Sequence, residues 1–332
     1  MRRRAFLGGL SLTGAAGLLG LMPGPSDAEP APETTRLRLT FQGRTICAGL
    51  RYFRELLEAE GFTDLQYARE ESLPRRLARL ASGESDIDIT YAANLIVRID
   101  AADPIVVLAG AHVGCFELFA ANGIRRIREL KGKVVAIDEF GGVRHVYTAS
   151  MAAYVGLDPR KDVKWVIYSG AEAIRLLAEG KIDALMATPP EPQEIRTKKI
   201  ARVVVNSTTD RPWSQYFCCA VAGNREFVRM HPVAAKRALR AMLKAADLCA
   251  VEPERAAQRL VDSGVTARYE YVVQTMKEIP YGKWRAYNPE DTMRFYALRL
   301  HEAGMIKSTP QRIIAQGTDW RLLNGLKKEM KT

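Results

Sequence analysis

One phrase occurs twice in this chain of 332 residues, and it constrains the fold more than any other feature. "LASGESDID" begins at Leu80 and "LAEGKIDAL" begins at Leu177, so both copies read Leu-Ala-x-Gly-x-x-Asp. Each copy follows an amphipathic, helix-like run and leads into an apolar, β-rich run. The glycine is typical of a helix C-terminus and the aspartate of a tight turn. We therefore interpret each copy as the helix, turn and strand of an α/β unit.

The two copies occupy equivalent places in a larger pattern. From Thr35 onward, short β-rich runs alternate with amphipathic helices, which is typical of α/β folds. The alternation begins again after the segment "GCFELF", with a new strand at "VVAID". Beyond Phe217 the pattern changes to long helices, expected at 231–251, 254–262, 269–278 and 289–303. Because the α/β alternation begins again between the two copies of the phrase, we predict two α/β lobes that face a shared cleft.

The first 28 residues are predicted to be an export signal rather than part of the fold. "MRRRAFLGGLSLTGAAGLLGLM" is a basic segment followed by an apolar, Gly-rich one, and small residues at Ser26 and Ala28 suit cleavage after Ala28. Arg3 and Arg4 resemble a twin-arginine signal, although Arg2 and Gly8 depart from its usual pattern. The alternative is a membrane anchor, but the apolar run is short. We expect a mature protein that is soluble in the periplasm.

Charge and cysteine content exclude several classes. The formal net charge is +11, but Lys and Arg alternate with acids and form no long basic block, so we expect no nucleic-acid partner. The five cysteines include no CxxC and no Cys/His pair at zinc spacing, so we expect no metal and no cofactor. Apolar neighbours, as in "YFCCAVA", favour buried thiols over a disulfide or a reactive site. No Gly-x-Ser-x-Gly or P-loop motif indicates catalysis.

At several of these passages the sequence resembles the periplasmic substrate-binding proteins of ABC importers. The passages are "YFRELLEAEGF", "LASGESDIDI", "IRELKGKVVAI", "LLAEGKIDALMATPPEP" and "AGNREFVRMHP". The branch is the nitrate/sulfonate/taurine-binding type, which shares its domain with thiamine-pyrimidine (NMT1/THI5-like) proteins. The resemblance extends from about Arg36 to Leu323.

The resemblance implies an α/β, two-lobed type II periplasmic binding protein fold with a helical C-terminal part. Lobe 1 would comprise residues 36–117 and 218–332, lobe 2 would comprise residues 118–217, and crossovers near Phe116 and Phe217 would form the hinge. Such a protein captures a small molecule, closes on it and presents it to ABC permease subunits at the inner membrane. We expect a monomer without enzymatic activity. Two alternatives stay open: a periplasmic sensor, and a pyrimidine-synthesising enzyme that uses a histidine and cysteines, although its longer cysteine cluster is absent here.

In such a fold the ligand meets loops at strand C-termini and helix N-termini, where free N–H groups favour anions. The candidate ligand-binding residues all lie in loops of that kind or at the two crossovers. They are Thr45, Ile46, Cys47, Tyr91, Asn94, His112, Glu117, Gly141, Gly142, Arg144, His145, Thr188, Glu191, Trp213, Gln215 and Tyr216.

Two ligand classes are compatible with these residues. Gly141 and Gly142 before a helix, with Arg144 and His145 in its first turn, suit a small oxyanion such as a sulfonate, carboxylate or nitrate. The aromatic and acidic candidates suit a planar nitrogen heterocycle instead. We expect the organic anion. Structural roles compete with binding: Asn94 as a helix N-cap, His112 in the core, Glu191 in helix capping, and the aromatic residues in hinge packing.

Overall fold

The computed structural model describes residues 29–41, 53–264 and 268–330. The chain divides into two compact units, residues 1–31 and residues 32–332, and the description below concerns the second unit. The predicted export signal at 1–28 and the candidates Thr45, Ile46 and Cys47 lie outside the described residues. No helix in the described part of the chain has both the length and the apolar character that a membrane span needs.

The first of two sheets has the strand order β2-β1-β3-β10-β4. Its strands are β1 (Arg36–Phe41), β2 (Asp64–Arg69), β3 (Ile87–Tyr91), β4 (Ile105–Val113) and β10 (Phe217–Asn224). β1 runs parallel to β2 and β3, whereas β10 lies antiparallel between β3 and β4. β4 and β10 are buried along their whole length, which explains why their sequences are mostly apolar or small rather than alternating. β3 is buried throughout as well, although Asp88 and Thr90 alternate with its isoleucines.

The second sheet has the order β7-β6-β8-β5-β9 and repeats the same topology. Its strands are β5 (Glu117–Ala120), β6 (Val134–Ile137), β7 (Lys164–Ile167), β8 (Ala184–Ala187) and β9 (Arg202–Asn206). β6 is parallel to β7 and β8, and β5 lies antiparallel between β8 and β9. In each sheet, therefore, the antiparallel strand is the one that follows a crossover from the other sheet.

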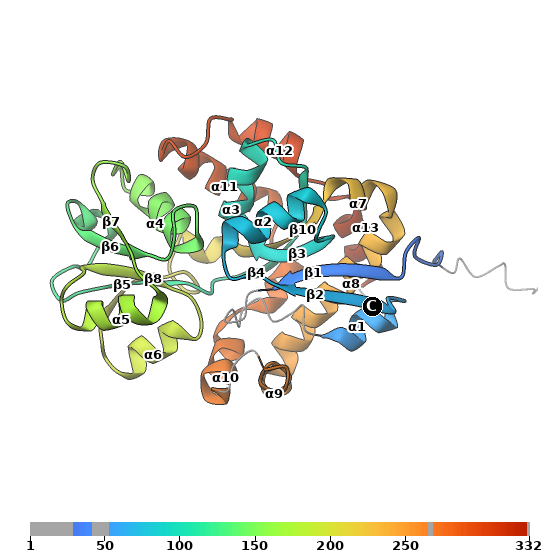
Figure 1. Ribbon diagram of the computed structural model, residues 1–332, viewed down its shortest axis with the longest axis horizontal. Helices are drawn as coiled ribbons and strands as arrows, with labels where there is room; N and C mark the ends of the chain where they lie inside the picture. Colours follow the sequence, from blue (N-terminus) through green and yellow to red (C-terminus); the bar gives the residue numbers. More distant parts are fainter. Residues whose placement is uncertain (1–28, 42–52, 265–267, 331–332) are drawn as a thin grey trace, which may run out of the picture. The chain divides into compact units, whose positions relative to one another are not determined.

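The helices and short 3₁₀ helices connect and cover these strands. They are α1 (Arg54–Ala59), α2 (Leu73–Ser82), α3 (Ala92–Asp100), η2 (Ile127–Leu130), α4 (Val143–Tyr154), α5 (Gly170–Ala178), α6 (Glu191–Thr197), η3 (Trp213–Gln215), α7 (Arg225–Met230), α8 (Pro232–Val251), α9 (Pro253–Asp262), α10 (Tyr269–Glu278), η4 (Tyr281–Trp284), α11 (Pro289–Glu302), α12 (Pro310–Gly317) and α13 (Arg321–Glu329). Figure 1 shows α4 on one side of the second sheet and α5 and α6 on the other. Apolar residues of α4 accordingly belong to one core cluster and those of α5 and α6 to another.

The repeated phrase has the same structural role in both sheets. Gly83 caps the C-terminus of α2 with φ +77°, and Gly180 follows α5 with φ +69°, in the left-handed region that glycine adopts without steric cost. The carboxylate of Asp86 accepts the backbone N–H of Arg38 in β1 at 2.7 Å. Asp183 accepts the N–H of Val134 in β6, the equivalent strand, also at 2.7 Å. Each aspartate thus joins the strand that follows it to the neighbouring parallel strand, and the predicted helix–turn–strand units are confirmed.

Two chain segments pass between the sheets. Residues 114–116 connect β4 to β5, and residues 207–216 connect β9 to β10. The two crossovers contact each other, because the hydroxyl of Ser207 accepts the Phe116 N–H at 3.0 Å and donates to the Phe116 carbonyl at 2.6 Å. The division into two lobes at these crossovers stays a proposal; the α/β architecture with a helical C-terminal part is the observed fold.

Candidate functional site

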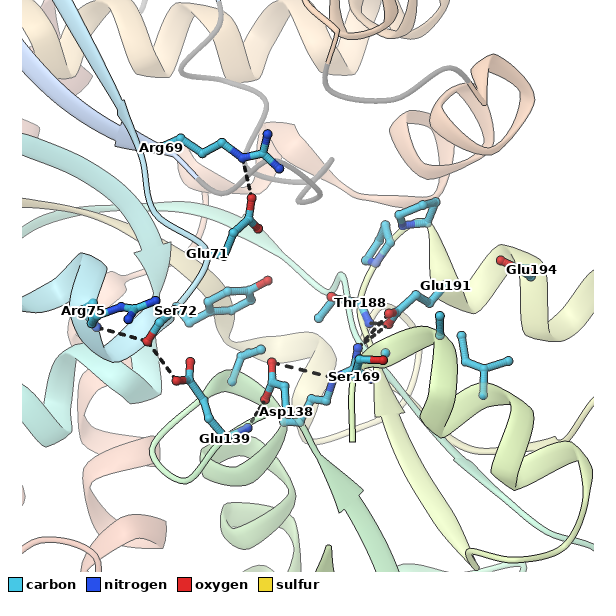
Figure 2. A pocket seen from close by; sticks show the side chains of 18 residues that line it. Arg69, Glu71, Ser72, Arg75, Asp138, Glu139, Ser169, Thr188, Glu191 and Glu194 are labelled. Carbon is cyan, nitrogen blue, oxygen red and sulfur yellow. Dashed lines mark hydrogen bonds and ion pairs between the residues drawn. The ribbon is translucent and has the colours of Figure 1, made fainter. Parts of the chain in front are cut away.

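A cavity of about 640 Å³ lies where the carboxyl ends of strands from both sheets meet. Its walls come from the segments after β2, β3, β6, β7 and β8 and from the first turns of α2, α4, α5 and α6 (Figure 2). The volume suits a small organic molecule. Of the candidates named from the sequence, the cavity is lined by Tyr91, Arg144, Thr188 and Glu191.

Arg144 is a buried member of an ion pair rather than an exposed cation. Its side chain is 7% exposed, and its Nη2 donates to both carboxylate oxygens of Glu191 at 2.7 and 2.8 Å. Nη1 donates to the backbone carbonyl of Met186 at 2.7 Å, and Nε lies 3.9 Å from the carboxylate of Asp138. Burial by itself lowers the pKa of Arg144, but the carboxylates of Glu191 and Asp138 outweigh this effect and raise it. The guanidinium therefore connects α4, β8 and α6 within the wall of the cavity.

Two glycines leave the space that this ion pair needs. A Cβ on Gly170, the first residue of α5, would lie 2.2 Å from Glu191 Oε1 and 2.8 Å from Arg144 Nη2. A Cβ on Gly142 would lie 2.8 Å from Asp138 Oδ1. Larger residues at either position would displace the charged groups. Gly141 has φ +77°, so the predicted tight turn before α4 is present.

Carboxylates outnumber cations around the cavity. Its lining includes three arginines and five acidic residues. The acidic residues are Glu71, Asp138, Glu139, Glu191 and Glu194. Arg69 and Arg75 are exposed at the rim, where they pair with the neighbouring Glu71 and Glu70. Arg144 is already paired with Glu191 and lies 3.9 Å from the half-exposed Asp138, so the negative charge of Asp138 is compensated only in part. This arrangement attracts N–H donors and cationic groups.

The two sides of the cavity are in contact through the turn that follows β6. The Glu139 carboxylate accepts hydrogen bonds from the Ser72 hydroxyl at 2.8 Å and from the Leu73 N–H at 3.0 Å, at the N-terminus of α2. Asn94 in α3 donates its side-chain amide to the carbonyl of Gly141 at 2.8 Å. The N-cap position of α3 is Tyr91, so the alternative that Asn94 serves as an N-cap is wrong.

Three polar candidates lie away from the lining. His145 accepts the Gly141 N–H on Nδ1 and packs between Phe140 and Trp165, and burial lowers its pKa. His112 is fully buried in β4 with its ring against Tyr281. Glu117 is 5% exposed and forms an ion pair with Arg196 of α6 at 2.7 Å.

The three candidates at the second crossover are also outside the lining. Trp213 is buried against Tyr154 and Phe295, and Tyr216 stacks on Phe295 with centroids 4.0 Å apart. Gln215 is exposed. These two aromatic residues therefore pack against side chains of α4 and α11.

Several lining residues were not candidates from the sequence. Asp138 directly follows β6 and Ser169 lies two residues after β7, the same kind of position that led to Thr188 after β8. Ser72 and Arg75 lie at the start of α2, where "SLPR" carries the usual Ser N-cap and early proline. The expectation that ligands meet the C-terminal ends of strands, applied to every parallel strand, would have identified Asp138 and Ser169.

Four cysteines lie in the described part of the chain, and all are buried thiols, as the sequence predicted. Cys47 lies outside it. His112, Cys115 and Cys219 place one imidazole nitrogen and two sulfurs within 4.8 Å of one another, which is a spacing that a metal ion could bridge. The thiol of Cys218 lies beside them, 2.7 Å from that of Cys115.

Three solved structures with a similar fold are binding proteins by name. The periplasmic nitrate-binding protein NrtA from Synechocystis PCC 6803 is 16% identical, with a TM-score of 0.74 over 91% of this chain and 90% of its own. The alkanesulfonate-binding protein SsuA from Xanthomonas axonopodis pv. citri, bound to MOPS, is 17% identical, with a TM-score of 0.68 over 88% and 99%. The periplasmic aliphatic sulphonate binding protein SsuA from Escherichia coli is 18% identical, with a TM-score of 0.66 over 85% and 92%.

The names of these three proteins describe binding. No curated protein sequence matches the chain. The sequence model of the family described as "NMT1/THI5 like" matches residues 60–256, which is more than half of the chain. This protein therefore has the periplasmic binding protein fold and belongs to the NMT1/THI5-like family.

Proposed function

We propose that this protein is an exported solute-binding protein that captures a small organic molecule in the cavity between its two sheets and delivers it to an ABC permease. The observation that carries the proposal is the position of the cavity, at the carboxyl ends of the parallel strands of both sheets. Open α/β sheets bind ligands at this edge. The two adjacent crossovers supply a hinge about which the lobes, residues 36–117 with 218–332 and residues 118–217, would close.

The cavity favours a ligand with a cationic nitrogen or several N–H donors. Arg144 is neutralised by Glu191 at 2.7 Å, so an anion would have to displace a carboxylate that is already in place. Asp138 remains to accept N–H groups from a ligand, and Tyr91 offers a ring in the wall. An amidine-like or amino-substituted heterocycle meets both requirements.

A small organic anion, such as a sulfonate, a carboxylate or nitrate, is the second candidate. It is favoured by the N-terminus of α5, because Ser169, Gly170 and Ala171 line the cavity and a helix N-terminus attracts negative charge. It also agrees with the binding properties named for NrtA and SsuA.

A ligand screen tests the proposal and separates the two classes. The chain from Glu29 onward is heated with sulfonates, nitrate, carboxylates, amidines and aminopyrimidines, and binders are confirmed by calorimetry. A ligand at 100 times its Kd should stabilise the folded protein by about 2.7 kcal/mol. Asp138→Asn should weaken the binding of a nitrogen ligand by roughly tenfold, equivalent to about 1.4 kcal/mol, and should strengthen the binding of an anion.

Asp262→Asn is the control and should not change the affinity for either ligand class. Asp262 lies at the exposed end of α9, far in sequence from every lining segment. Binding of no compound in the panel, or equal binding by the wild type and by Asp138→Asn, would contradict a ligand site at this cavity.

A further inference from the structure

Two cysteine thiols are in contact where the two crossovers join the first sheet. Cys115 belongs to the first crossover, between β4 and β5, and Cys218 is the second residue of β10, directly after the second crossover. Their sulfur atoms lie 2.7 Å apart, and the residues are 4% and 1% exposed. They come from positions 103 residues apart in the chain. Neither residue lines the ligand cavity.

The distance favours a sulfur–sulfur bond over a shared metal ion. Two thiolates bound to a tetrahedral zinc ion with bonds of about 2.3 Å are roughly 3.8 Å apart. A disulfide bond is about 2.04 Å long, so the two sulfurs at 2.7 Å need to approach by only about 0.7 Å. The thiols of Cys218 and its neighbour Cys219 are 3.9 Å apart, too far for the same step.

The backbone around both thiols is unusual in ways that fix their positions. Gly114 has φ +77° and Cys115 has φ +91°, a left-handed conformation that is costly for a residue with a side chain. A Cβ on Gly114 would lie 2.4 Å from the hydroxyl of Thr208, so the two crossovers are closely packed here. The pairing of β10 with β4 shifts register between Phe217 and Cys219, as at a β-bulge, which re-aims side chains.

We propose that Cys115, in the first crossover, and Cys218, at the start of β10, form a reversible disulfide. The oxidant is a small or protein disulfide. The Cys115 thiolate attacks one sulfur of that disulfide and expels the other as a thiol. The Cys218 thiolate then attacks the sulfur of Cys115 and releases the second thiol. The two protons that the cysteines lose end on the two released thiols, and the oxidant's disulfide gains the two electrons. Cys115 reacts first because it is the more exposed and also lines a small cavity beside Thr208 and Glu278.

The bond would restrict the proposed hinge. Backbone rotation in the crossovers is what lobe closure requires, so a cross-link that ties the first crossover to the strand after the second one limits the range of that rotation. This consequence rests on the proposed function, whereas formation of the bond does not. An oxidising compartment, such as the periplasm proposed above, would maintain the disulfide.

Peptide mapping under non-reducing conditions tests the bond itself. The mature chain is reduced, freed of reductant and then treated with oxidised glutathione in the folded state. We expect the loss of two of the five thiols and one linked pair of tryptic peptides, residues 99–125 with residues 203–225. Reduction should restore all five thiols.

Single variants assign the bond, because Cys218 and Cys219 share a peptide. Cys115→Ala and Cys218→Ala should each abolish the linked pair. Cys219→Ala, and Cys249→Ala in the buried α8, should retain it and serve as controls for folding. Hydrogen exchange of residues 114–118 should be slower in the oxidised protein than in the reduced protein.

Three outcomes would overturn the proposal. One is five reactive thiols after oxidation of the folded protein. Another is a linked pair that survives Cys218→Ala, which would assign the bond to Cys219. The third is one equivalent of tightly bound zinc in the purified protein that protects Cys115, which would assign the cluster with His112 and Cys219 to a metal. If oxidation forms the bond but does not change ligand binding, then the bond itself is supported and only its effect on the hinge is contradicted.

Discussion

At the scale of single residues, the partners of a side chain decide what it does. Arg144 begins the helix after a Gly-Gly turn, a position that suits anion binding, but its guanidinium is enclosed by Glu191 and Met186. Arg144→Ala should therefore lower the free energy of unfolding by about 1.5–3 kcal/mol, the range for hydrogen bonds to charged groups. Urea denaturation of the ligand-free protein measures the difference.

Arg75→Ala is the matched control for Arg144. Its side chain is 73% exposed on the rim of the same cavity, so its removal should change stability by less than about 0.5 kcal/mol. Equal denaturation midpoints for Arg144→Ala and the wild type would show that the ion pair contributes nothing to the folded state.

At the scale of elements, one arginine joins α6 to both β5 and α10. Arg196 contacts Glu117 at 2.7 Å and Glu278 at 2.8 Å. Burial raises the pKa of Glu117 to about 7, Arg196 opposes this effect, and Glu278 and Asp210 add to it. Within the described residues, Oε2 of Glu117 has no hydrogen-bond partner. The carboxyl group is thus held in a place where its neutral form is favoured.

The raised pKa predicts a pH dependence with a definite sign. Folding stabilises the protonated form of Glu117, so its contribution is fully present below about pH 4.5 and is lost as pH rises through about 7. Relative to Glu117→Gln, the wild type should lose on the order of 2–3 kcal/mol of unfolding free energy between pH 4.5 and pH 8. Denaturation curves across this range measure the difference.

Glu84→Gln, an exposed carboxylate after α2, is the control for the pH series. Its stability should differ from that of the wild type by a nearly constant amount across the range. If the curve for Glu117→Gln runs parallel to that of the wild type as well, then Glu117 is ionised in the folded protein throughout.

At the scale of the whole molecule, closure about the crossovers is the central expectation. Residues 114–116 and 207–216 are the connections between the two sheets, so a rotation of one sheet relative to the other must occur in them. Small-angle scattering of the mature chain should show a smaller radius of gyration at saturating ligand than without ligand. The hydrogen bonds from Ser72 and Leu73 to Glu139 already connect the two sides of the cavity.

Ser72→Ala provides a variant for this measurement, since it removes one contact across the cavity, together with the N-cap of α2, and keeps the hinge. It should increase the radius of the ligand-free protein while leaving the ligand-bound radius unchanged. A radius that does not respond to saturating ligand would count against closure.

The sequence by itself determined the local units and their repetition. The Leu-Ala-x-Gly-x-x-Asp phrase specifies a helix end, a left-handed glycine and an aspartate beside a strand, and these depend on neighbours a few residues away. The same holds for the C-terminal helices, since the expected 269–278 is observed as α10. Tyr91, Arg144, Thr188 and Glu191 were found because strand ends and helix starts are visible in the hydrophobic pattern.

Only the tertiary structure decided which of these groups neutralise one another. β5 and β10 are short apolar runs, and nothing in their sequence reveals that each inserts antiparallel into the sheet reached by a crossover. The pairing of Arg144 with Glu191, 47 residues away, follows from that topology, and so does the approach of Cys115 to Cys218 over 103 residues. The physical reason is that charge and thiol chemistry depend on distance in space, and long-range contacts fix that distance only after the sheets have formed.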